Sequence, residues 1–377
     1  MSKVKLGEVA IEHKETCKGS KDGYPIVGLE HLVPEEVTLT AWDEGSDNTF
    51  TKMFRKGNVL FGRRRAYLKK AAVAPFDGIC SGDITVIEAI PDRILPELLP
   101  FIIQNDDLFD FAVGKSAGSL SPRVKWEHLK NYEFELPDME KQRELAELLW
   151  AMDATKKSYQ KLIAATDELV KSQFMEQFVI EAPYERTRLG NHISQIRGVS
   201  YKPADLRPSL SEESVLLLRA NNIGAGRINH DEVQYVAKEK VSTVQLIQAG
   251  DILMCASSGS LEHVGKAAIC LPTIAGETFG AFCKLIRPKG DLLPEYIAAY
   301  LETDEYREII MQLACGSNIN NLKTEHIDEL LIPTPPADVQ EAFVSFLRQS
   351  DKSKFELEQA LSELTATYKR IITENLG

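Results

Sequence analysis

The two halves of the chain repeat each other, and this duplication limits the possible folds more than any other feature of the sequence. The segment LPELLPFIIQND (Leu95–Asp106) recurs as LPEYIAAYLETD (Leu293–Asp304), and a constant shift of 198 residues relates the two. The same shift places SAGSLSPRVKWEHL (Ser116–Leu129) over ACGSNINNLKTEHI (Ala314–Ile327). A repeat of about 200 residues is far longer than a solenoid unit, and each copy is large enough to bury its own core. The sequence therefore predicts two related domains in tandem.

The first part of each copy predicts a mixed α/β domain. Short β-rich runs alternate with Gly and Pro, which is typical of strands and turns. KGNVLF (Lys56–Phe61) resembles AGDILM (Ala249–Met254), although the shift changes here, as it does across loops of unequal length. The LPE stretch predicts a helix, because Pro96 and Pro294 suit a first helical turn. In the first copy Pro100 must then lie in the first turn or kink the helix.

A long helix is predicted at the end of each copy. Residues 138–178 and 338–376 contain neither Pro nor Gly, and apolar residues recur there at helical spacing. Each helix has roughly 40 residues and is roughly 60 Å long, so its apolar stripe cannot be buried within one small domain. Pairing of the two helices as an antiparallel coiled coil is the simplest solution. The predicted helix-pairing residues are Leu145, Leu148, Met152, Tyr159, Leu162 and Leu169 in the first helix and Phe343, Phe346, Leu357, Leu361 and Leu364 in the second.

The predicted fold class follows from these elements. The chain is α+β, with two mixed α/β domains in tandem repeat, separated by two long antiparallel coiled-coil helices. An antiparallel return of the second helix gives a pseudo-two-fold and nearly circular organisation, with Gly377 near Met1. The predicted boundaries are 1–137 for the first domain, 138–180 for the first helix, 181–335 for the second domain and 336–377 for the second helix.

Two related domains on a rigid spacer suit a two-part target, and double-stranded DNA is the natural candidate because its half-sites recur about 34–36 Å apart on one face. The charge argues the other way: the net charge is −12 over 377 residues, whereas DNA-binding domains often have a pI above about 9. Each of the four predicted segments is itself acidic on balance. DNA binding therefore requires either basic residues gathered on one face of each domain or a partner that supplies most phosphate contacts, and we expect both.

The remaining composition points to a cytoplasmic protein. The first residues carry charges throughout and have no apolar signal segment, and no run of about 18 apolar residues could span a membrane. The six cysteines form no CxxC pair, so reduced thiols are expected. The seven histidines show no metal-ligand spacing, and no metal site is predicted.

Candidate DNA contacts in the first copy lie in FRKGNVLFGRRRAYLKK (Phe54–Lys70), which has seven basic residues and no acidic one. Arginine can bind guanine edges bidentately, and lysine suits phosphate. A solvated surface hairpin is the alternative interpretation. The candidates of this copy, including three from the junction after the LPE helix, are Arg55, Arg63, Arg64, Arg65, Tyr67, Lys69, Lys70, Ser119, Arg123 and Lys125.

The second copy has a small polar loop, CASSGSLEHVGK (Cys255–Lys266), where the first has arginines. GSNINNLK (Gly316–Lys323) and RANNIGAGRIN (Arg219–Asn229) add asparagines, which can pair bidentately with adenine. Ordinary loops and a helix N-cap are the alternatives. The candidates of this copy are Arg219, Asn221, Asn222, Ser257, Ser258, Ser260, Lys266, Ser317, Asn318, Asn320, Asn321 and Lys323.

The chain resembles the specificity (S) subunit of Type I restriction–modification systems. GSLSPRVKWEHLKNYEFELPDMEKQRELAELL and GSNINNLKTEHIDELLIPTPPADVQEAFVSFL, with Gln142 and Gln340, look like the family's junction into its long helix. GNVLFGRRRAYLKKAAVA is similar to one class of target-recognition domain. The duplication of domain plus helix extends the resemblance over the whole chain.

The resemblance implies that each target-recognition domain binds one half of a bipartite DNA site. The helices would set the gap and dock two methyltransferase (M) subunits, which would carry S-adenosylmethionine and methylate adenine at N6 after flipping it from the duplex. The chain itself would hold no cofactor, and restriction (R) subunits would join in systems that have them. Because the Arg-rich and Ser-rich loops differ, the predicted site is asymmetric.

Other classes of function compete with this interpretation. A fused methyltransferase or nuclease needs catalytic motifs, and the sequence has no NPPY- or DPPY-type tetrapeptide, no Walker A motif and no HExxH. The chain is therefore predicted not to be an enzyme. A scaffold whose domains bind protein rather than DNA is compatible with the acidic charge. A stand-alone transcription factor is disfavoured because no helix-turn-helix pattern is visible.

Overall fold

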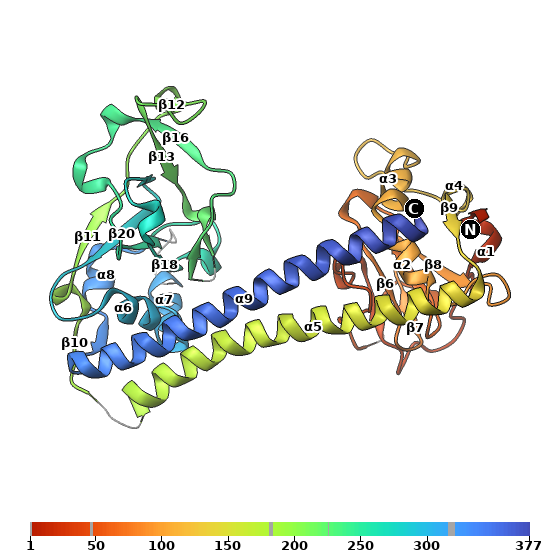
Figure 1. The fold of residues 1–377 in the computed structure, drawn as a ribbon, viewed down its shortest axis with the longest axis horizontal. Coiled ribbons are helices and arrows are strands. Elements are labelled where there is room, and N and C mark those ends of the chain that lie inside the picture. The colour runs from red at the N-terminus through yellow and green to blue at the C-terminus, as the bar shows by residue number, and fades with distance from the viewer. Residues whose placement is uncertain (1, 46–47, 181–183, 225, 316–320) are drawn as a thin grey trace. The chain divides into compact units, whose positions relative to one another are not determined.

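The computed structural model describes residues 2–45, 48–180, 184–224, 226–315 and 321–377. They form two compact units, each described by itself below (Figure 1). Unit 1 comprises Met1–Lys161 and Leu357–Gly377, and unit 2 comprises Leu162–Glu356. Each unit thus contains one copy of the repeat and parts of both long helices.

Unit 1 is built on a four-stranded antiparallel sheet of order β2-β8-β5-β6. A second sheet has the order β3-β7-β4, and β1 pairs with β9. Successive side chains of β5 belong to two different cores, since Val59 and Phe61 pack in one and Leu60 in the other. The strands are β1 (Ser2–Lys5), β2 (Ala10–Glu12), β3 (Ile26–Val27), β4 (Lys52–Phe54), β5 (Val59–Gly62), β6 (Ala71–Val73), β7 (Gly78–Cys80), β8 (Ile84–Ala89) and β9 (Glu133–Leu136). The short helices are α1 (Leu6–Val9), α2 (Leu99–Ile103), α3 (Asp106–Gly114) and α4 (Trp126–Leu129).

Unit 2 repeats this plan with a four-stranded antiparallel sheet of order β11-β20-β17-β18. A second sheet has the order β12-β16-β13-β19, and β10 pairs with β21. Along β17, Ile252 and Met254 pack in one core and Leu253 in another, as in β5. The strands are β10 (Arg186–Arg188), β11 (Ile193–Arg197), β12 (Leu206–Arg207), β13 (Ser214–Leu218), β14 (Ile223–Gly224), β15 (Arg227–Ile228), β16 (Gln234–Ala237), β17 (Ile252–Cys255), β18 (Ala267–Ile269), β19 (Thr278–Phe279), β20 (Cys283–Pro288) and β21 (Leu331–Pro333). The short helices are α6 (Pro294–Tyr300), α7 (Asp304–Cys315) and α8 (Thr324–Asp328).

The turn before β5 and β17 shows how closely the two copies correspond. Gly57 and Gly250 both have positive φ, at 89° and 86°. The next residue closes the turn in each unit: Asn58 Oδ1 accepts from Arg55 N (2.8 Å), and Asp251 Oδ2 accepts from Gln248 N (2.7 Å). The resemblance of KGNVLF to AGDILM therefore reflects one repeated strand entry.

The LPE stretch forms a helix in both units, but the helix begins at different residues. α6 begins at Pro294, whereas α2 begins only at Leu99. Pro100 consequently lies in the first turn of α2, where it interrupts no helical hydrogen bond.

The long helices are α5 (Met139–Met175), continued by one π-helical segment (Glu176–Ile180), and α9 (Ala337–Leu376). A buried glutamine attaches each one to its own unit. In unit 1, Gln142 Oε1 accepts from Leu95 N (2.8 Å) and its Nε2 donates to Pro137 O (2.9 Å). In unit 2, Gln340 makes the same two bonds, from Leu293 N (2.9 Å) and to Pro335 O (2.9 Å). The LPE helix is thereby tied to the junction in both copies.

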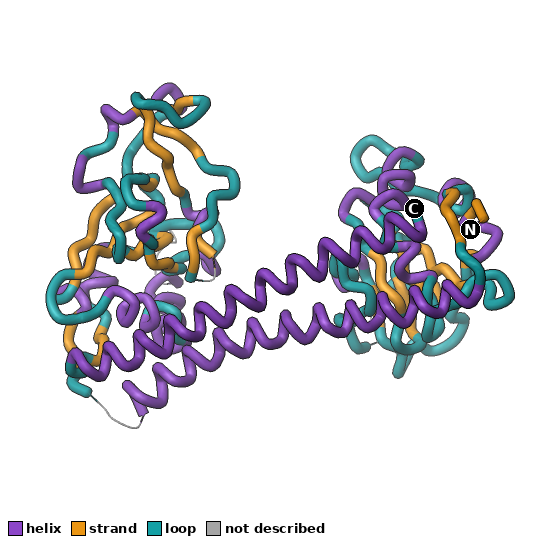
Figure 2. Tube along the Cα trace, in the orientation of Figure 1, coloured by secondary structure: helices purple, strands orange, loops and turns teal. Residues whose placement is uncertain are grey.

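Each unit buries parts of both long helices. In unit 1, Leu145 and Leu149 share a core with Ile372 and Leu376. In unit 2, Phe174 of α5 packs against Tyr296 of α6 (ring centroids 5.2 Å apart) and edge-on against Phe343 of α9 (5.6 Å). Figure 2 shows α6 and α7 between the strands of unit 2 and the adjoining part of α9.

The predicted pairing residues of the helices fall into three groups. Leu145, Met152 and Phe343 are buried, and Leu148, Leu162 and Leu169 are about half exposed. The buried stripe passes through Leu149 instead of Leu148, because Leu149 packs in the core that also holds Ile372 and Leu376, whereas Leu148 points away from that core. The remaining residues, Tyr159, Phe346, Leu357, Leu361 and Leu364, are partly buried. Among the described residues, no helix is long and apolar enough to cross a membrane.

Candidate functional site

In unit 1, the arginine-rich strand end is held between two other segments. Arg63 N donates to Asp83 O (3.0 Å), at the turn before β8, and Val124 N donates to Arg63 O (3.0 Å). The next residue, Arg64, forms an antiparallel bridge with Arg123. Three segments that are distant in sequence therefore meet where β5 ends.

In unit 2, the serine-rich strand end is held in the same way. Ala256 N donates to Phe282 O (2.9 Å), at the turn before β20, and Leu322 N donates to Ala256 O (2.8 Å). The next residue, Ser257, forms an antiparallel bridge with Asn321.

The two sets of bonds have the same register, so the backbone presents three side chains at equivalent positions in each unit. We call these the frame residues: Arg64, Asp83 and Arg123 in unit 1, and Ser257, Phe282 and Asn321 in unit 2. The backbone is repeated and the side chains are not. The two units thus present different chemistry at equivalent backbone positions.

The frame residues of unit 1 form an ionic cluster. Asp83 accepts from Arg123 through two hydrogen bonds, Nε to Oδ1 (2.7 Å) and Nη2 to Oδ2 (3.2 Å). Arg64 Nε donates to Ser121 Oγ (2.6 Å), and its Nη1 lies 3.5 Å from Asp83 Oδ2. The hydrogen bond from Arg123 and the charges of the nearby arginines hold the pKa of the Asp83 carboxyl below its usual value, against the effect of burial. The carboxylate therefore stays ionised and restrains both guanidinium groups.

Several other basic residues of this segment are engaged in contacts within unit 1. Arg55 is ion-paired with Glu15 and Asp77. Lys69 Nζ lies 2.5 Å from Asp106 Oδ1, and Lys70 Nζ donates to Leu29 O (2.7 Å). Acidic residues distant in sequence thus fold against part of this basic segment.

Arg65 and Lys69 flank an exposed turn with a strained backbone. Both residues have positive φ, at 55° and 51°, a backbone conformation that is uncommon for residues other than glycine. Arg65 N donates to Pro122 O (2.8 Å), which ties this turn to the loop that carries Arg123. Tyr67 lies within the turn and is 55% exposed. Backbone strain of this kind often accompanies a functional loop.

The frame of unit 2 carries no charged side chain. Phe282 is 70% exposed, and its carbonyl oxygen accepts from both Ala256 N (2.9 Å) and Ser257 N (3.0 Å). Ser258 Oγ accepts from Ser260 N (3.2 Å) within the same loop. An aromatic ring is thus exposed at the position that Asp83 holds in unit 1.

Of the candidates around Arg219, the structure corrects Asn222. Asn222 is completely buried: its Oδ1 accepts from Arg219 N (2.9 Å) and its Nδ2 donates to Asp231 O (2.7 Å). Its amide therefore stabilises a turn and cannot contact a ligand. Arg219 itself donates to Glu232 O, and Asn221 is exposed beside the turn.

The remaining candidates differ in exposure. Besides Asn221, the exposed ones are Arg65, Tyr67, Ser119, Lys125, Ser260, Lys266, Asn321 and Lys323. The partly exposed ones are Arg55, Arg63, Arg64, Lys69, Lys70, Arg123, Arg219, Ser257 and Ser258. Ser317, Asn318 and Asn320 lie outside the described residues.

Asp83 and Phe282 did not emerge from the sequence as candidates. Neither lies in a basic or polar cluster, and the shift between copies is 199 at this pair, one more than the 198 of the LPE helix. An alignment of DITVIEAI (Asp83–Ile90) with FCKLIRPK (Phe282–Lys289) would have placed Asp83 and Phe282 at equivalent positions.

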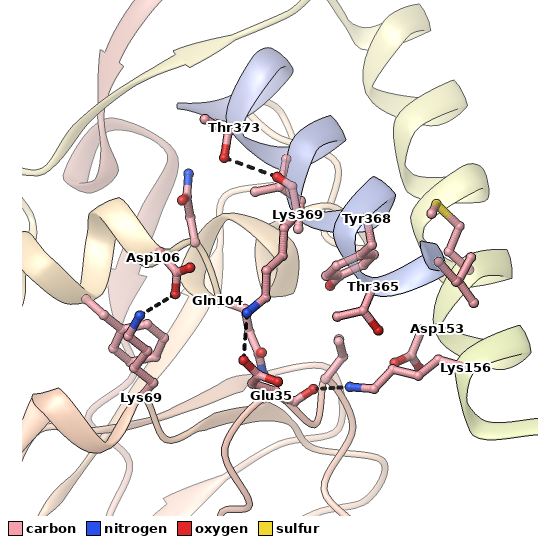
Figure 3. Close-up of a pocket in the computed structure, with 16 residues that line it drawn as sticks. Glu35, Lys69, Gln104, Asp106, Asp153, Lys156, Thr365, Tyr368, Lys369 and Thr373 are labelled. Carbon is pink, nitrogen blue, oxygen red and sulfur yellow. Dashed lines mark hydrogen bonds and ion pairs between the residues drawn. The ribbon is translucent and has the colours of Figure 1, made fainter. Parts of the chain in front are cut away.

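Unit 1 also contains a small cavity of about 60 Å³, bounded by α3, α5, α9 and the loop at Glu35 (Figure 3). Lys369 Nζ pairs with Glu35 Oε1 (2.7 Å) across it, and Lys156 Nζ donates to Glu35 O (2.9 Å). The Tyr368 hydroxyl is buried beside them, and burial raises the pKa of that phenol well above its usual value. A space of this size holds a few water molecules rather than an organic ligand. We therefore interpret the contacts of Lys369 and Lys156 with Glu35 as structural: they attach α9 and α5 to the domain.

One group among the described residues has the composition of a cation site. Ligand atoms of Glu30, His31 and Asp43 lie within 4.8 Å of one another. His31 Nδ1 already accepts from Gly28 N (3.0 Å), and both acids are exposed. Exposed groups of this kind are common at protein surfaces, and we assign no metal to it.

Comparison with known proteins defines the class to which this fold belongs. The family model of the Type I restriction modification DNA specificity domain matches residues 1–165 and 219–365. These segments make up most of the chain, and the chain belongs to this family.

Individual specificity subunits match different shares of the chain. That of Type I restriction enzyme StySPI from Salmonella potsdam is 38% identical over 169 residues, which are 44% of this chain and 36% of that protein. That of EcoKI from Escherichia coli (strain K12) is 37% identical with the same coverage, so the matches span about a third of the length of these two relatives. That of MjaVIII from Methanocaldococcus jannaschii is 20% identical over 90% of this chain and 79% of its own.

Two solved structures share the fold over almost the whole chain. One, from work on the complex assembly and conformational transition of the type I R-M system, has a TM-score of 0.59 at 20% identity and covers 99% of this chain and 97% of its own. The other is the Type-I restriction-modification system S subunit from M. genitalium, with a TM-score of 0.59 at 12% identity and coverage of 100% and 96%. At these identities the similarity concerns the fold alone.

Proposed function

We propose that the chain is the sequence-specific DNA-recognition subunit of a Type I restriction–modification complex and is itself not an enzyme. Each target-recognition domain would bind one half of an asymmetric bipartite site. The observation that carries this proposal is the pair of frames, in which one backbone arrangement presents two unlike sets of side chains. Two copies of a domain with different frame residues suit two different half-sites.

The acidic charge of the chain is compatible with this function if phosphate contacts come largely from a partner. Backbone phosphates dominate the affinity of most DNA-binding proteins. Here Arg55 and Lys69 are neutralised by acids of their own unit, whereas Arg65 and Lys125 are exposed. We therefore expect weak, salt-sensitive binding by the isolated chain and specific binding in the complex.

The domain organisation proposed for this function is 1–137 and 181–335 for the two target-recognition domains, with helices at 138–180 and 336–377. The helices would form an antiparallel coiled coil that sets the gap between the half-sites. In support, Leu149 near the start of α5 shares a core with Ile372 near the end of α9. Asp167, farther along α5, pairs with Lys354, which lies earlier in α9 (2.5 Å).

A nearly circular organisation is part of the same proposal. In its support, Ser2 pairs with Leu136 in the β1–β9 ladder, and Glu135 N donates to Gly377 O (3.4 Å). β9 is the strand that leads into α5. Both ends of the described chain therefore contact the strand from which the first long helix departs.

The partners proposed are double-stranded DNA, two methyltransferase subunits and, in a complex that cleaves DNA, restriction subunits, all in the cytoplasm. The methyltransferases would carry S-adenosylmethionine. Leu148, Leu162 and Leu169 remain about half exposed on α5 and are available for such a partner. A protein-binding scaffold without DNA recognition is the alternative, which the family membership does not favour.

The test is to express the chain with its cognate methyltransferase in a host that lacks modification and to map methylated adenines by single-molecule sequencing. We expect one bipartite, non-palindromic motif that disappears when the chain is omitted. A palindromic motif, or methylation independent of the chain, would contradict the proposal. Duplex binding by the purified chain with and without the methyltransferase separates DNA recognition from a scaffold role.

A further inference from the structure

We propose that the two frames select different base pairs, a G·C pair in unit 1 and an A·T pair in unit 2. Arg64 and Arg123, restrained by Asp83, would recognise guanine. Phe282 and Asn321 would recognise an A·T pair. This inference rests on the proposed function and extends it from the class of target to the chemistry of each half-site.

The guanidinium groups that Asp83 restrains match the acceptors of guanine. A guanidinium carries five N–H donors, and Asp83 occupies only two of those of Arg123. The remaining donors belong to a side chain that is 40% exposed. Arg64 is 39% exposed, and its Nε is held by Ser121. Guanine offers O6 and N7 as paired acceptors in the major groove, which a fork of N–H donors matches.

Asp83 acts in this scheme as a positioning residue. It receives hydrogen bonds from Arg123 and lies close to Arg64, so it limits the rotamers of both side chains before DNA arrives. Restraint in the binding conformation removes part of the entropic cost of association. The carboxylate also repels phosphate, so the cluster favours a neutral base edge over the DNA backbone.

The exposed ring of Phe282 favours an A·T pair in unit 2. Its backbone is fixed by hydrogen bonds from Ala256 and Ser257, while 70% of the residue remains exposed. An apolar side chain in a DNA groove contacts the thymine methyl group, which is a feature of A·T pairs alone. A cytosine or guanine at that place would offer the ring a polar edge and no methyl group.

Asn321 supplies the polar half of the same recognition. Its backbone is bridged to Ser257 next to Phe282, and the residue is exposed. Its side-chain amide offers one acceptor and a donor group, which match N6 and N7 of adenine. The frame of unit 2 thus combines a thymine-methyl contact with an adenine contact and has no side chain that prefers guanine.

The experiment uses the full chain with its cognate methyltransferase and maps methylated motifs for variants of each frame. Arg123→Lys keeps the charge but loses the donor fork, and Asp83→Asn keeps the shape but weakens the restraint. Phe282→Ala and Asn321→Ala alter the other frame. Arg93→Ala and Leu271→Ala, exposed residues outside the frames, are the matched controls. Thermal unfolding of every variant establishes that it is folded.

We expect Arg123→Lys and Asp83→Asn to relax a G·C position in one half of the motif only. Phe282→Ala and Asn321→Ala should relax an A·T position in the other half only, and the controls should retain the wild-type motif. A single good base contact corresponds to a preference of roughly 5-fold to 150-fold, so the relaxed position should lose preference on that scale.

Two results would overturn this inference while leaving the proposed function intact. One is a wild-type bipartite motif that all four folded variants reproduce. The other is relaxation of the same half-site by Arg123→Lys and Phe282→Ala. Failure of the proposed function is distinguishable, because the wild-type chain would then direct no methylated motif at all.

Discussion

Removal of the glutamine that joins each long helix to its LPE segment should destabilise that junction locally. Gln142 is 2% exposed and makes two hydrogen bonds to backbone groups, at 2.8 and 2.9 Å. Gln142→Ala leaves Leu95 N–H and Pro137 C=O without these partners inside the protein. A buried polar group left unsatisfied costs about 1–3 kcal/mol, so the two together cost roughly 2–4 kcal/mol after partial relaxation.

Hydrogen exchange read by mass spectrometry measures this effect, because the exchange rate of a protected amide follows its local opening equilibrium. A change of about 2–4 kcal/mol corresponds to roughly 30-fold to 1,000-fold faster exchange. In Gln142→Ala the acceleration should centre on the peptide that contains Leu95. Gln340→Ala should accelerate exchange around Leu293, because Gln340 accepts from Leu293 N and donates to Asp291 O. Its third hydrogen bond is donated to Pro335 O.

The matched controls are Gln160→Ala and Gln349→Ala, exposed positions on the same helices. These variants should exchange like the wild type at Leu95 and Leu293. The reasoning is refuted if Gln142→Ala exchanges at Leu95 no faster than Gln160→Ala. It is also refuted if Gln142→Ala and Gln340→Ala accelerate the same peptides, since the two attachments lie in different units.

Further predictions concern thiols, a turn, pH and salt. Burial raises the pKa of Cys80 and of Cys270 to about 12, so iodoacetamide at pH 8 should label Cys17 in the native chain and spare these two, as peptide mass spectrometry would show. Gly57→Ala should destabilise the fold by about 1–2 kcal/mol and lower Tm, because φ is positive at this position. No steric clash adds to this cost, since no other atom obstructs a Cβ there. The depressed pKa of Asp83 keeps its ion pairs intact above the unfolded value near 3.9. They are lost only as pH falls through the lower folded pKa, so recognition of the unit 1 half-site should not change between pH 8 and pH 5. The logarithm of the duplex affinity of the complex, measured by fluorescence anisotropy, should fall linearly with the logarithm of the salt concentration.

The fold could be predicted from the sequence where the repeat conserves both residues and spacing. The junctions at Gln142 and Gln340 keep the 198-residue shift, and the structure gives both glutamines the same two hydrogen bonds. The strand entry at Gly57 and Gly250 was detectable for a related reason, because only a few residue types suit a positive φ.

The helix seam was less predictable. Spacings of three and four fit several neighbouring stripes equally well, and the choice between Leu148 and Leu149 depends on what packs against the helix. Leu149 contacts the core that also holds Ile372 and Leu376, whereas Leu148 remains exposed. Tertiary packing, which the pattern of a single helix does not contain, decides between them.

The candidate site was only partly predictable because its charges are balanced by residues distant in sequence. Arg64 and Arg123 stood out as basic residues, but Asp83 joins them only through the bonding at the end of β5. Phe282 occupies the equivalent place in unit 2 and lies in no polar cluster. A search for basic or polar patches could not select either residue.

The measurement that tests the central claim most directly is a methylation map of a host genome, made with and without this chain beside its methyltransferase. The account predicts a motif of two short, unlike blocks separated by a fixed gap, present only with the chain. A palindromic motif, a single uninterrupted block, or an unchanged map when the chain is absent would contradict it.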